Sequence, residues 1–342
     1  MRNTLSRVAW LALGMACLPA LSPAFAPAFA GEITVYSALE EDEIAAYLER
    51  AAADMPDVTV NLLRLSTGDL GARIIAEAGN PQADVIWGFA VTNMLNPAIY
   101  DQLAAYKAAG EDALGEQFRD KEGRWFAPTG YVGAFCVNTE RLAQIGAPVP
   151  TSWADLKNPA YKGEVVMPDP GSSGTGYLQI AAILQGAGEE AGWQLIKDID
   201  PNMAQYTTSG SRPCRMAQAG EFAIGASLSY VAMQGIEEGY PIQMVIPADY
   251  AGFELEANGL MAAAKNPDDA KRFLDWTLGA GAAEAYAARK DLVTIPGVPR
   301  SPQAEKAGLP EDLTAVLFPM NFAASGETRD AIITKWREAV GR

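Results

Sequence analysis

From residue 31 onward, short runs of apolar and β-branched residues alternate with longer amphipathic runs. The short runs predict strands at 32–38, 58–65 and 83–89. The longer runs that follow them predict helices at 40–55, 69–79 and 92–103. Strands that alternate with helices in this way are typical of an α/β fold built on a doubly wound, mostly parallel sheet.

The alternation starts again after a long apolar run at 125–138, which itself predicts a strand. Further strands are predicted at 163–169, 222–229, 239–247 and 253–265. Further helices are predicted at 175–187, 189–198 and 266–279. A chain of 342 residues is long enough for two domains of about 150 residues each, so we expect two α/β units.

The first thirty residues have a different pattern, which is that of an export signal. Two arginines precede an apolar run at 8–21, and the small residues of 28–30 fit a signal peptidase site. We expect a cleaved signal peptide at 1–30, with cleavage after Ala26 as the alternative, and a periplasmic mature protein. No later segment reaches the roughly 18 consecutive apolar residues that a membrane span needs.

Charge and residue content argue against several function classes. Removal of residues 1–30 takes Arg2 and Arg7 from the 26 basic residues and none of the 42 acidic ones, so the mature net charge is −18. Nucleic acid, which needs a basic face, is not an expected partner. The chain has no histidine, which removes the commonest general base and transition-metal ligand. We therefore expect no enzyme, no cofactor and no metal, and a hydrolase of phosphate esters is only a distant alternative.

Two cysteines, Cys136 and Cys214, follow the export signal. They are too few for a scaffold held together mainly by disulfides. Each lies in an otherwise ordinary predicted element. We expect two buried free thiols, although an oxidising compartment would allow them to pair.

Hydroxyl-bearing residues and glycines follow several predicted strands. The stretch 169–176, DPGSSGTG, leads directly into a predicted helix, and similar corners occur at Ser66-Thr67 and at 207–211. Any one corner alone is an ordinary helix cap, because serine and threonine cap helices and glycine relieves backbone strain. In open α/β sheets, however, such corners meet at one crevice. Free N–H groups at helix N-termini bind phosphate-like anions there, so we favour an anion site.

Six segments occur in a characteristic order along the chain. They are ITVYSALE, STGDLGARIIAE, NPQADVIWGFA, DPGSSGTGYLQIAA, SGSRPCRMAQAGEFAIG and EANGLMAAAKNPDDAKRFLDW. Together they resemble the periplasmic solute-binding proteins of the ferric-iron-binding class over nearly the whole mature chain. YSALE and QADVIWG are most similar to the branch that binds 2-aminoethylphosphonate for an ABC importer. The resemblance implies a small-molecule ligand and an ABC permease in the inner membrane as partner, and we expect a monomer.

The resemblance also implies a two-lobed periplasmic binding protein fold of type II. In this fold the ligand is trapped in a cleft when the lobes close by hinge bending. Crossing strands would join the lobes near 127–133 and 247–254. Lobe 1 would then be discontinuous, formed by 31–130 and 250–342, and lobe 2 would be 131–249.

The phosphonate end of the implied ligand needs hydrogen-bond donors. The expected donors come from the glycine-rich corner and from the corners that face it: Ser172, Ser173, Gly174, Thr175, Ser66, Thr67 and Ser209. Arg212 is a further candidate, because a guanidinium matches such oxygens bidentately, or else it is a solvated surface residue.

The ammonium end needs a carboxylate. Glu40 is the first choice and Glu254 the second, although Glu40 also suits a helix start. Trp87 or Tyr230 would cover the methylenes with a cation–π contact worth about 0.5–2 kcal/mol, or else they pack in the core. The candidate set is completed at the end of the first predicted strand by Tyr36 and Ser37.

Iron-binding members of the class provide a chemical test of the ligand. They hold the metal with a histidine, a glutamate and two adjacent tyrosines, and the matching positions here are Glu40, Phe89, Tyr230 and Val231. Phe89 and Val231 cannot ligate a cation, so too few hard oxygen ligands remain for Fe(III). Ferric iron, phosphate and sugar phosphate remain alternative ligands for the same fold.

Overall fold

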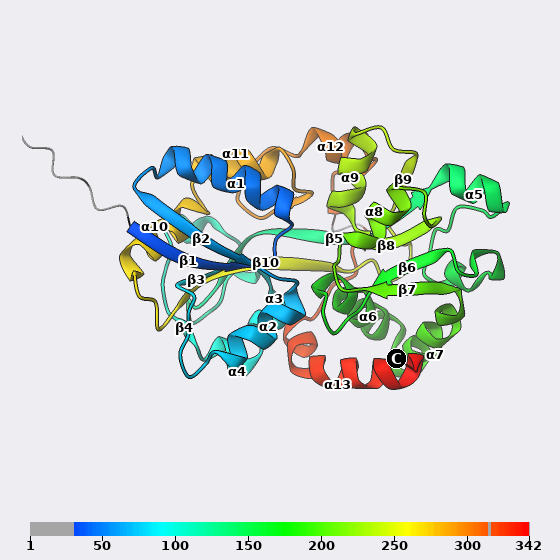
Figure 1. Ribbon diagram of the computed structural model, residues 1–342, viewed down its shortest axis with the longest axis horizontal. Helices are drawn as coiled ribbons and strands as arrows, with labels where there is room; N and C mark the ends of the chain where they lie inside the picture. The colour runs from blue at the N-terminus through cyan, green and yellow to red at the C-terminus, as the bar shows by residue number, and fades with distance from the viewer. Residues whose placement is uncertain (1–30, 314–315, 342) are drawn as a thin grey trace, which may run out of the picture.

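The computed structural model describes residues 31–313 and 316–341, which form two α/β lobes side by side (Figure 1). The predicted signal peptide at 1–30 lies outside the described residues. Lobe 1 is built on the strands β1 (Gly31–Ser37), β2 (Val58–Arg64), β3 (Val85–Ala90) and β4 (Leu103–Ala104). Its helices are α1 (Glu41–Asp54), α2 (Thr67–Ala76), α3 (Val91–Met94), α4 (Pro97–Tyr100), α10 (Pro267–Trp276) and α11 (Ala280–Ala287).

Most of these elements agree with the predicted ones, and β1 pairs in parallel with both β2 and β3 as a doubly wound sheet requires. The predicted helix at 92–103 is instead divided into α3 and α4. Pro97 causes the break, because proline has no N–H to continue a helix and fits only its first turn.

Lobe 2 has the same architecture. Its strands are β6 (Val165–Pro168), β7 (Met203–Thr207), β8 (Ile224–Leu228) and β9 (Ile242–Val245). Its helices are α5 (Thr139–Ile145), α6 (Gly174–Ala187), α7 (Glu189–Ile199), α8 (Arg212–Gln218) and α9 (Ser229–Glu237). β6 pairs in parallel with β7 and β8, and β7 adds a strand that the sequence pattern did not predict.

Two long strands, β5 (Phe126–Asn138) and β10 (Phe253–Met261), connect the lobes. The first half of β5 pairs with β10, and its second half pairs with β8 and β9. The main path of the sheet therefore runs β2-β1-β3-β10-β5-β8-β6-β7 through both lobes. All thirteen residues of β5 are buried. The chain crosses between the lobes along β5 and again just before β10.

The C-terminal region completes the structure with three elements. They are β11 (Leu292–Val293), α12 (Pro302–Lys306) and α13 (Phe322–Val340). Short 3-10 helices occur at Glu111–Ala113, Glu116–Phe118, Ala154–Lys157, Pro159–Tyr161 and Asp200–Asn202. Among the described residues, none of the helices has both the length and the apolar character that crossing a membrane takes.

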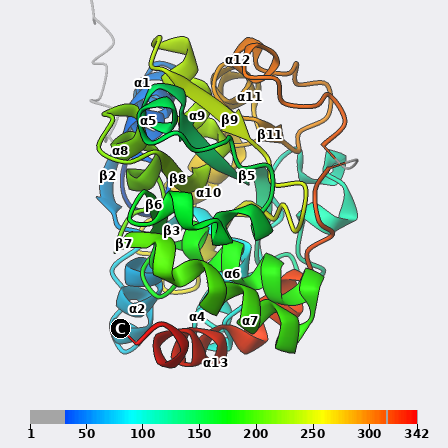
Figure 2. The same ribbon diagram turned by 90° about the vertical axis from the view of Figure 1, so that its right-hand side faces the viewer.

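The helix α13 does not fit the expected assignment of 250–342 to lobe 1. Trp336 and Val340 belong to the hydrophobic core of lobe 2, where the ring of Trp336 lies 4.9 Å from that of Tyr206. Figure 2 shows α13 alongside α7 and below α6. The start of α13 still reaches lobe 1, because a Cβ on Gly326 would lie 3.1 Å from the Cβ of Leu95. The chain therefore returns to lobe 2 after β10, and α13 touches both lobes.

The expectation of two free thiols is wrong. Cys136 on β5 and Cys214 on α8 form a disulfide, with their Cα atoms 5.2 Å apart. The two residues meet because α8 packs across β5 and β8 on one face of the lobe 2 sheet. The bond thus ties α8 to the crossing strand.

We expect loss of this disulfide to lower the free energy of unfolding by about 2–4 kcal/mol, because the bond links residues 78 positions apart and restricts the unfolded chain. Thermal unfolding with and without a reductant measures the effect. The double variant Cys136→Ala/Cys214→Ala is the control, since it should match the reduced protein and not respond to reductant. A reductant-independent transition in the wild-type protein would contradict this prediction.

Candidate ligand-binding site

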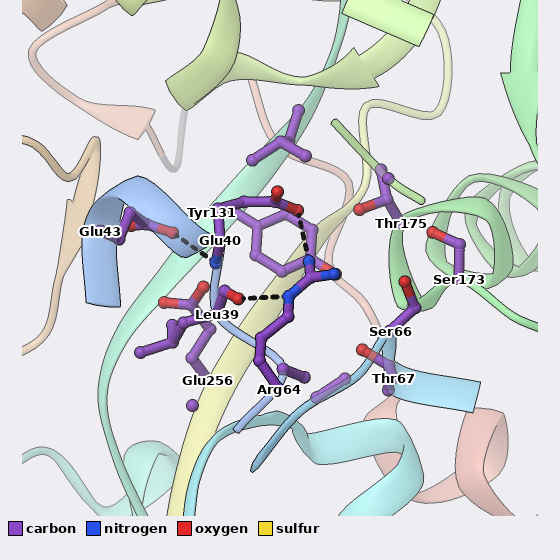
Figure 3. Close-up of a pocket in the computed structure, with 16 residues that line it drawn as sticks. Leu39, Glu40, Glu43, Arg64, Ser66, Thr67, Tyr131, Ser173, Thr175 and Glu256 are labelled. Carbon is purple, nitrogen blue, oxygen red and sulfur yellow. Dashed lines mark hydrogen bonds and ion pairs between the residues drawn. The ribbon is translucent and has the colours of Figure 1, made fainter. Parts of the chain in front are cut away.

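A pocket lies between the two lobes, at the carboxyl ends of β1, β2, β3 and β6. Figure 3 shows hydroxyl-bearing residues on one side of it, carboxylates on the other, and Arg64 and Tyr131 between them. Six predicted site residues line this pocket: Glu40, Ser66, Thr67, Ser173, Gly174 and Thr175. The structure therefore brings together one corner from each lobe, as the position of strand ends in an α/β sheet predicts.

The N-termini of α2 and α6 form the hydroxyl-bearing side. Ser173 caps α6, and its Oγ accepts a hydrogen bond from the Gly176 N–H at 3.3 Å. Ser66 occupies the cap position of α2 but makes no side-chain cap bond. The two corners meet across the cleft, because a Cβ on Gly174 would lie 2.7 Å from Thr67 Oγ1. N–H groups in the first turn of a helix have no acceptor within it, so both helices present donors to the pocket.

Tyr131 reaches this group of donors from the crossing strand β5. Like Thr175, it lines the pocket. Burial, with a smaller contribution from Glu254, raises the pKa of the Tyr131 phenol well above its ordinary value. The phenol therefore stays protonated and adds a neutral hydroxyl to the anion side of the pocket.

Arg64 pairs with Glu40 in the middle of the pocket. Its guanidinium lies 3.2 Å from Glu40 Oε1, and its Nε donates to the Leu39 carbonyl at 3.0 Å. The other carboxylate oxygen, Glu40 Oε2, accepts a hydrogen bond from Ser211 Oγ of lobe 2 at 2.7 Å. Burial raises the pKa of Glu40, and Arg64 opposes that rise. The carboxylate that we expected to bind an ammonium thus already has a cationic partner.

Two further carboxylates, Glu43 and Glu256, line the pocket with a buried lysine behind them. Lys290 Nζ lies 2.6 Å from Glu43 Oε1 and 2.8 Å from Glu256 Oε1. Glu256 Oε2 also accepts from Thr129 Oγ1 at 2.6 Å. Burial raises the pKa of Glu43, and Lys290 opposes that rise. These residues hold two acceptors in fixed positions at the edge of the pocket.

Three charged residues that complete the pocket, Arg64, Glu43 and Lys290, could not be identified from the sequence. Arg64 is the last residue of β2, one before the end of the predicted strand, and Glu43 lies three residues after Glu40 in the capping box of α1. These positions are the only local indications in the sequence that Arg64 and Glu43 belong to the pocket. Nothing near Lys290 in the sequence indicates that it pairs with Glu43 and Glu256.

Three predicted residues on β1 and β3 point away from the pocket. The Tyr36 hydroxyl donates to Glu77 Oε2 at 2.8 Å, and the Ser37 Oγ accepts from the Leu39 N–H at 3.2 Å. Trp87 is buried in the core of lobe 1, where its ring lies 5.3 Å from that of Phe273. They stabilise the fold around the pocket and do not line it.

Three predicted residues of lobe 2 lie beside the pocket but not on its wall. Ser172 Oγ donates to the Thr208 carbonyl at 3.3 Å, and Ser209 Oγ lies 3.0 Å from Ser211 Oγ. Arg212 is exposed and does not line the pocket, so the solvated alternative fits it.

Glu254 and Tyr230 are occupied by other partners. Glu254 is fully buried and accepts a hydrogen bond from Thr92 Oγ1 at 2.6 Å, and burial raises its pKa to about 7. The Tyr230 hydroxyl donates to Asp42. Of the positions that match iron ligands, only Glu40 lines the pocket, and Phe89 is fully buried in the core of lobe 1.

Comparisons with known proteins agree with this architecture. Residues 80–323 match the family of bacterial extracellular solute-binding proteins. The chain is 33% identical over 296 residues to an uncharacterised protein of Haemophilus influenzae, covering 85% of this chain and 86% of that protein. It is 28% identical over 278 residues to a probable ABC transporter periplasmic-binding protein of Sinorhizobium fredii, covering 78% and 75%.

A solved structure gives the same result. The periplasmic binding protein AfuA from Actinobacillus pleuropneumoniae, with fructose 6-phosphate bound, has a TM-score of 0.84 at 30% identity. The likeness covers 91% of this chain and 99% of AfuA, and it confirms the predicted periplasmic binding protein fold. This chain belongs to the family of bacterial extracellular solute-binding proteins and is the solute-binding component of an ABC importer, not an enzyme.

Proposed function

We propose that this protein captures a small organic phosphate ester of the sugar phosphate class between its lobes. The observation that carries the proposal is that two helix N-termini, one from each lobe, face each other in the same pocket. Ser66 and Thr67 belong to one of them, and Ser173–Thr175 belong to the other. Helix N-termini with free N–H groups and hydroxyls bind phosphate, so lobe closure would surround a phosphate with donors.

The opposite side of the pocket favours hydroxyl groups on the rest of the ligand. Glu40 is already paired with Arg64, and Glu43 and Glu256 are paired with Lys290. Each carboxylate oxygen still has lone pairs that can accept from a neutral hydroxyl. A sugar phosphate supplies a phosphate and several hydroxyls, and AfuA, solved with fructose 6-phosphate bound, is a supporting relative.

2-Aminoethylphosphonate is the second candidate ligand, for a specific reason. Three carboxylates line the pocket, and the cations that pair directly with them among the described residues are Arg64 and the buried Lys290. An ammonium group would neutralise the remaining negative charge, and a phosphonate would take the place of the phosphate. This candidate keeps the anion site unchanged and differs only in what the carboxylates bind.

The transport role follows from the family and the expected export signal. We infer that the mature protein works in the periplasm as a monomer and delivers its ligand to an ABC permease in the inner membrane. The relative from Sinorhizobium fredii, described as a probable ABC transporter periplasmic-binding protein, supports this assignment.

Calorimetric titration of residues 31–342, stripped of carried ligand by unfolding and refolding with the disulfide intact, tests the proposal. The probes are fructose 6-phosphate, fructose, 2-aminoethylphosphonate, ethylphosphonate and inorganic phosphate. We expect fructose 6-phosphate to bind and fructose not to bind. Binding of 2-aminoethylphosphonate alone would favour the second candidate. If none of the phosphorus-containing probes binds, the proposed anion site is wrong.

The variant Thr175→Val removes one hydroxyl from the anion side and keeps the shape of the side chain. We expect it to weaken binding of the phosphorus-containing ligand about tenfold, because a hydrogen bond to a charged group is lost. Thr59→Val is the matched control, since Thr59 is exposed on β2 and lies away from the pocket. Equal affinities for the two variants would show that the Thr175 hydroxyl does not bind the ligand.

A further inference from the structure

Outside the ligand pocket, α1 of lobe 1 is joined to α8 and α9 of lobe 2 through Asp42. Gln234 Nε2 donates to Asp42 Oδ2 at 3.0 Å, and the Tyr230 hydroxyl donates to the same oxygen. The Arg215 guanidinium lies 3.4 Å from Asp42 Oδ1. One carboxylate thus binds three side chains, all of which belong to the opposite lobe. Figure 1 shows the end of α1 that carries Asp42 next to α9.

These contacts connect protein groups only. None of the four residues lines the ligand pocket, and Asp42 lies two positions beyond the pocket residue Glu40 in the sequence. The Asp42 side chain is 28% exposed and that of Arg215 is 47% exposed, so the cluster lies at the rim. A ligand in the pocket is therefore not needed to complete it.

The charge state of the cluster suits a strong contact. Burial opposes ionisation of Asp42, but the Tyr230 hydrogen bond and the nearby Arg215 outweigh it, so the pKa of Asp42 lies below its usual value. Burial, together with Glu43 and Asp42, raises the pKa of Tyr230, which therefore remains a donor. Hydrogen bonds to an ionised carboxylate are about twice as strong as neutral ones.

We propose that Asp42, Tyr230, Gln234 and Arg215 form an interlobe clasp that holds part of the ligand-free protein closed. The clasp raises the apparent affinity for every ligand. Only the closed fraction of the protein is competent to bind fully, so the apparent dissociation constant equals the intrinsic one divided by that fraction. Since the clasp touches no ligand, it changes all affinities by the same factor and leaves their ratios unchanged. The proposal does not depend on which solute the pocket takes.

Small-angle X-ray scattering of the ligand-free mature protein tests the clasp without any ligand. We expect Asp42→Ala to have a larger radius of gyration than the wild-type protein. Glu41→Ala is the matched control, because Glu41 is an exposed acidic residue in the same helical turn and should leave the radius unchanged. Equal radii for the wild-type protein and Asp42→Ala would overturn the proposal. If Asp42→Ala fails to fold, the variant Tyr230→Phe takes its place, because it removes only the hydroxyl. It too should have a larger radius of gyration than the wild-type protein, and an equal radius would overturn the proposal.

Titration supplies a second criterion with whichever probe binds. We expect Asp42→Ala to weaken binding about tenfold, the size of one charge-assisted hydrogen bond lost on closure. If fructose 6-phosphate and 2-aminoethylphosphonate both bind, both should weaken by the same factor. A changed ratio would place Asp42 in contact with ligand and overturn the clasp. The scattering result stands even if no probe binds, so failure of the proposed function and failure of the clasp remain distinguishable.

Discussion

Gly68→Ala is expected to weaken ligand binding about 10- to 100-fold while leaving the ligand-free protein folded. A Cβ on Gly68 would lie 2.0 Å from the Gly171 carbonyl oxygen and 2.9 Å from Ser172 Cα. The Gly68 N–H also donates to the Ser172 carbonyl at 2.8 Å. All these partners are backbone atoms of lobe 2, so a methyl group obstructs closure without disturbing lobe 1. Only a residue without a side chain permits this approach.

Two measurements together check this prediction. Titration gives the affinity, and scattering at saturating ligand shows whether the lobes of Gly68→Ala stay further apart than those of the wild-type protein. Gly79→Ala is the control, because a Cβ on Gly79 would meet no atom within 4 Å. Unchanged affinity and unchanged scattering for Gly68→Ala would show that the lobes do not need this backbone contact to retain ligand.

The alternation of strands and helices could be predicted because burial leaves a local periodicity in the sequence. β7 lacked such a signal, since it has only five residues and just two of them are buried. The lobe to which α13 belongs could not be predicted either. That depends on where the chain runs after β10, and the packing of Trp336 and Val340 in the lobe 2 core decides it.

The anion side of the site could be predicted from a rule of topology. Ser66, Thr67 and Ser173–Thr175 follow strands whose carboxyl ends meet at one crevice, and all of them line the pocket. The prediction for Trp87 was wrong because a position near a strand end does not by itself decide between crevice and core, and Trp87 packs against Phe273 in the core. Gly88 and Ala90 line the pocket, whereas Trp87 and Phe89 pack in the core of lobe 1.

Apart from Glu40, the charged side could not be predicted, because its residues meet only in three dimensions. Arg64 pairs with Glu40 from a neighbouring element, and Lys290, which pairs with Glu43, lies in a loop far along the chain. Tyr230 follows a strand as expected but turns its hydroxyl to Asp42. Pairings between distant charged residues leave no periodicity that a single sequence reveals.

Lys290→Met is expected to lower the free energy of unfolding by about 3–5 kcal/mol at neutral pH. The lysine side chain is fully buried, with Nζ 2.6 Å from Glu43 Oε1 and 2.8 Å from Glu256 Oε1. Its removal leaves two buried carboxylates without their cation. Denaturant unfolding measures the loss. Lys306→Met is the control, since its 2.7 Å ion pair with Glu237 is about half exposed and should contribute no more than about 1 kcal/mol.

The pH dependence of this loss separates charge from packing. Burial already raises the pKa of Glu43, and without Lys290 that pKa rises further above the unfolded value of about 4.3. An acid with a raised folded pKa destabilises the protein as pH rises through the unfolded pKa, so the deficit of Lys290→Met should shrink towards pH 4. Adding Glu256→Gln should restore part of the stability. A deficit that is constant with pH would instead indicate lost packing. Because Glu43 and Glu256 line the pocket, a pH-dependent deficit would measure the stability that Lys290 supplies to hold these two carboxylates there.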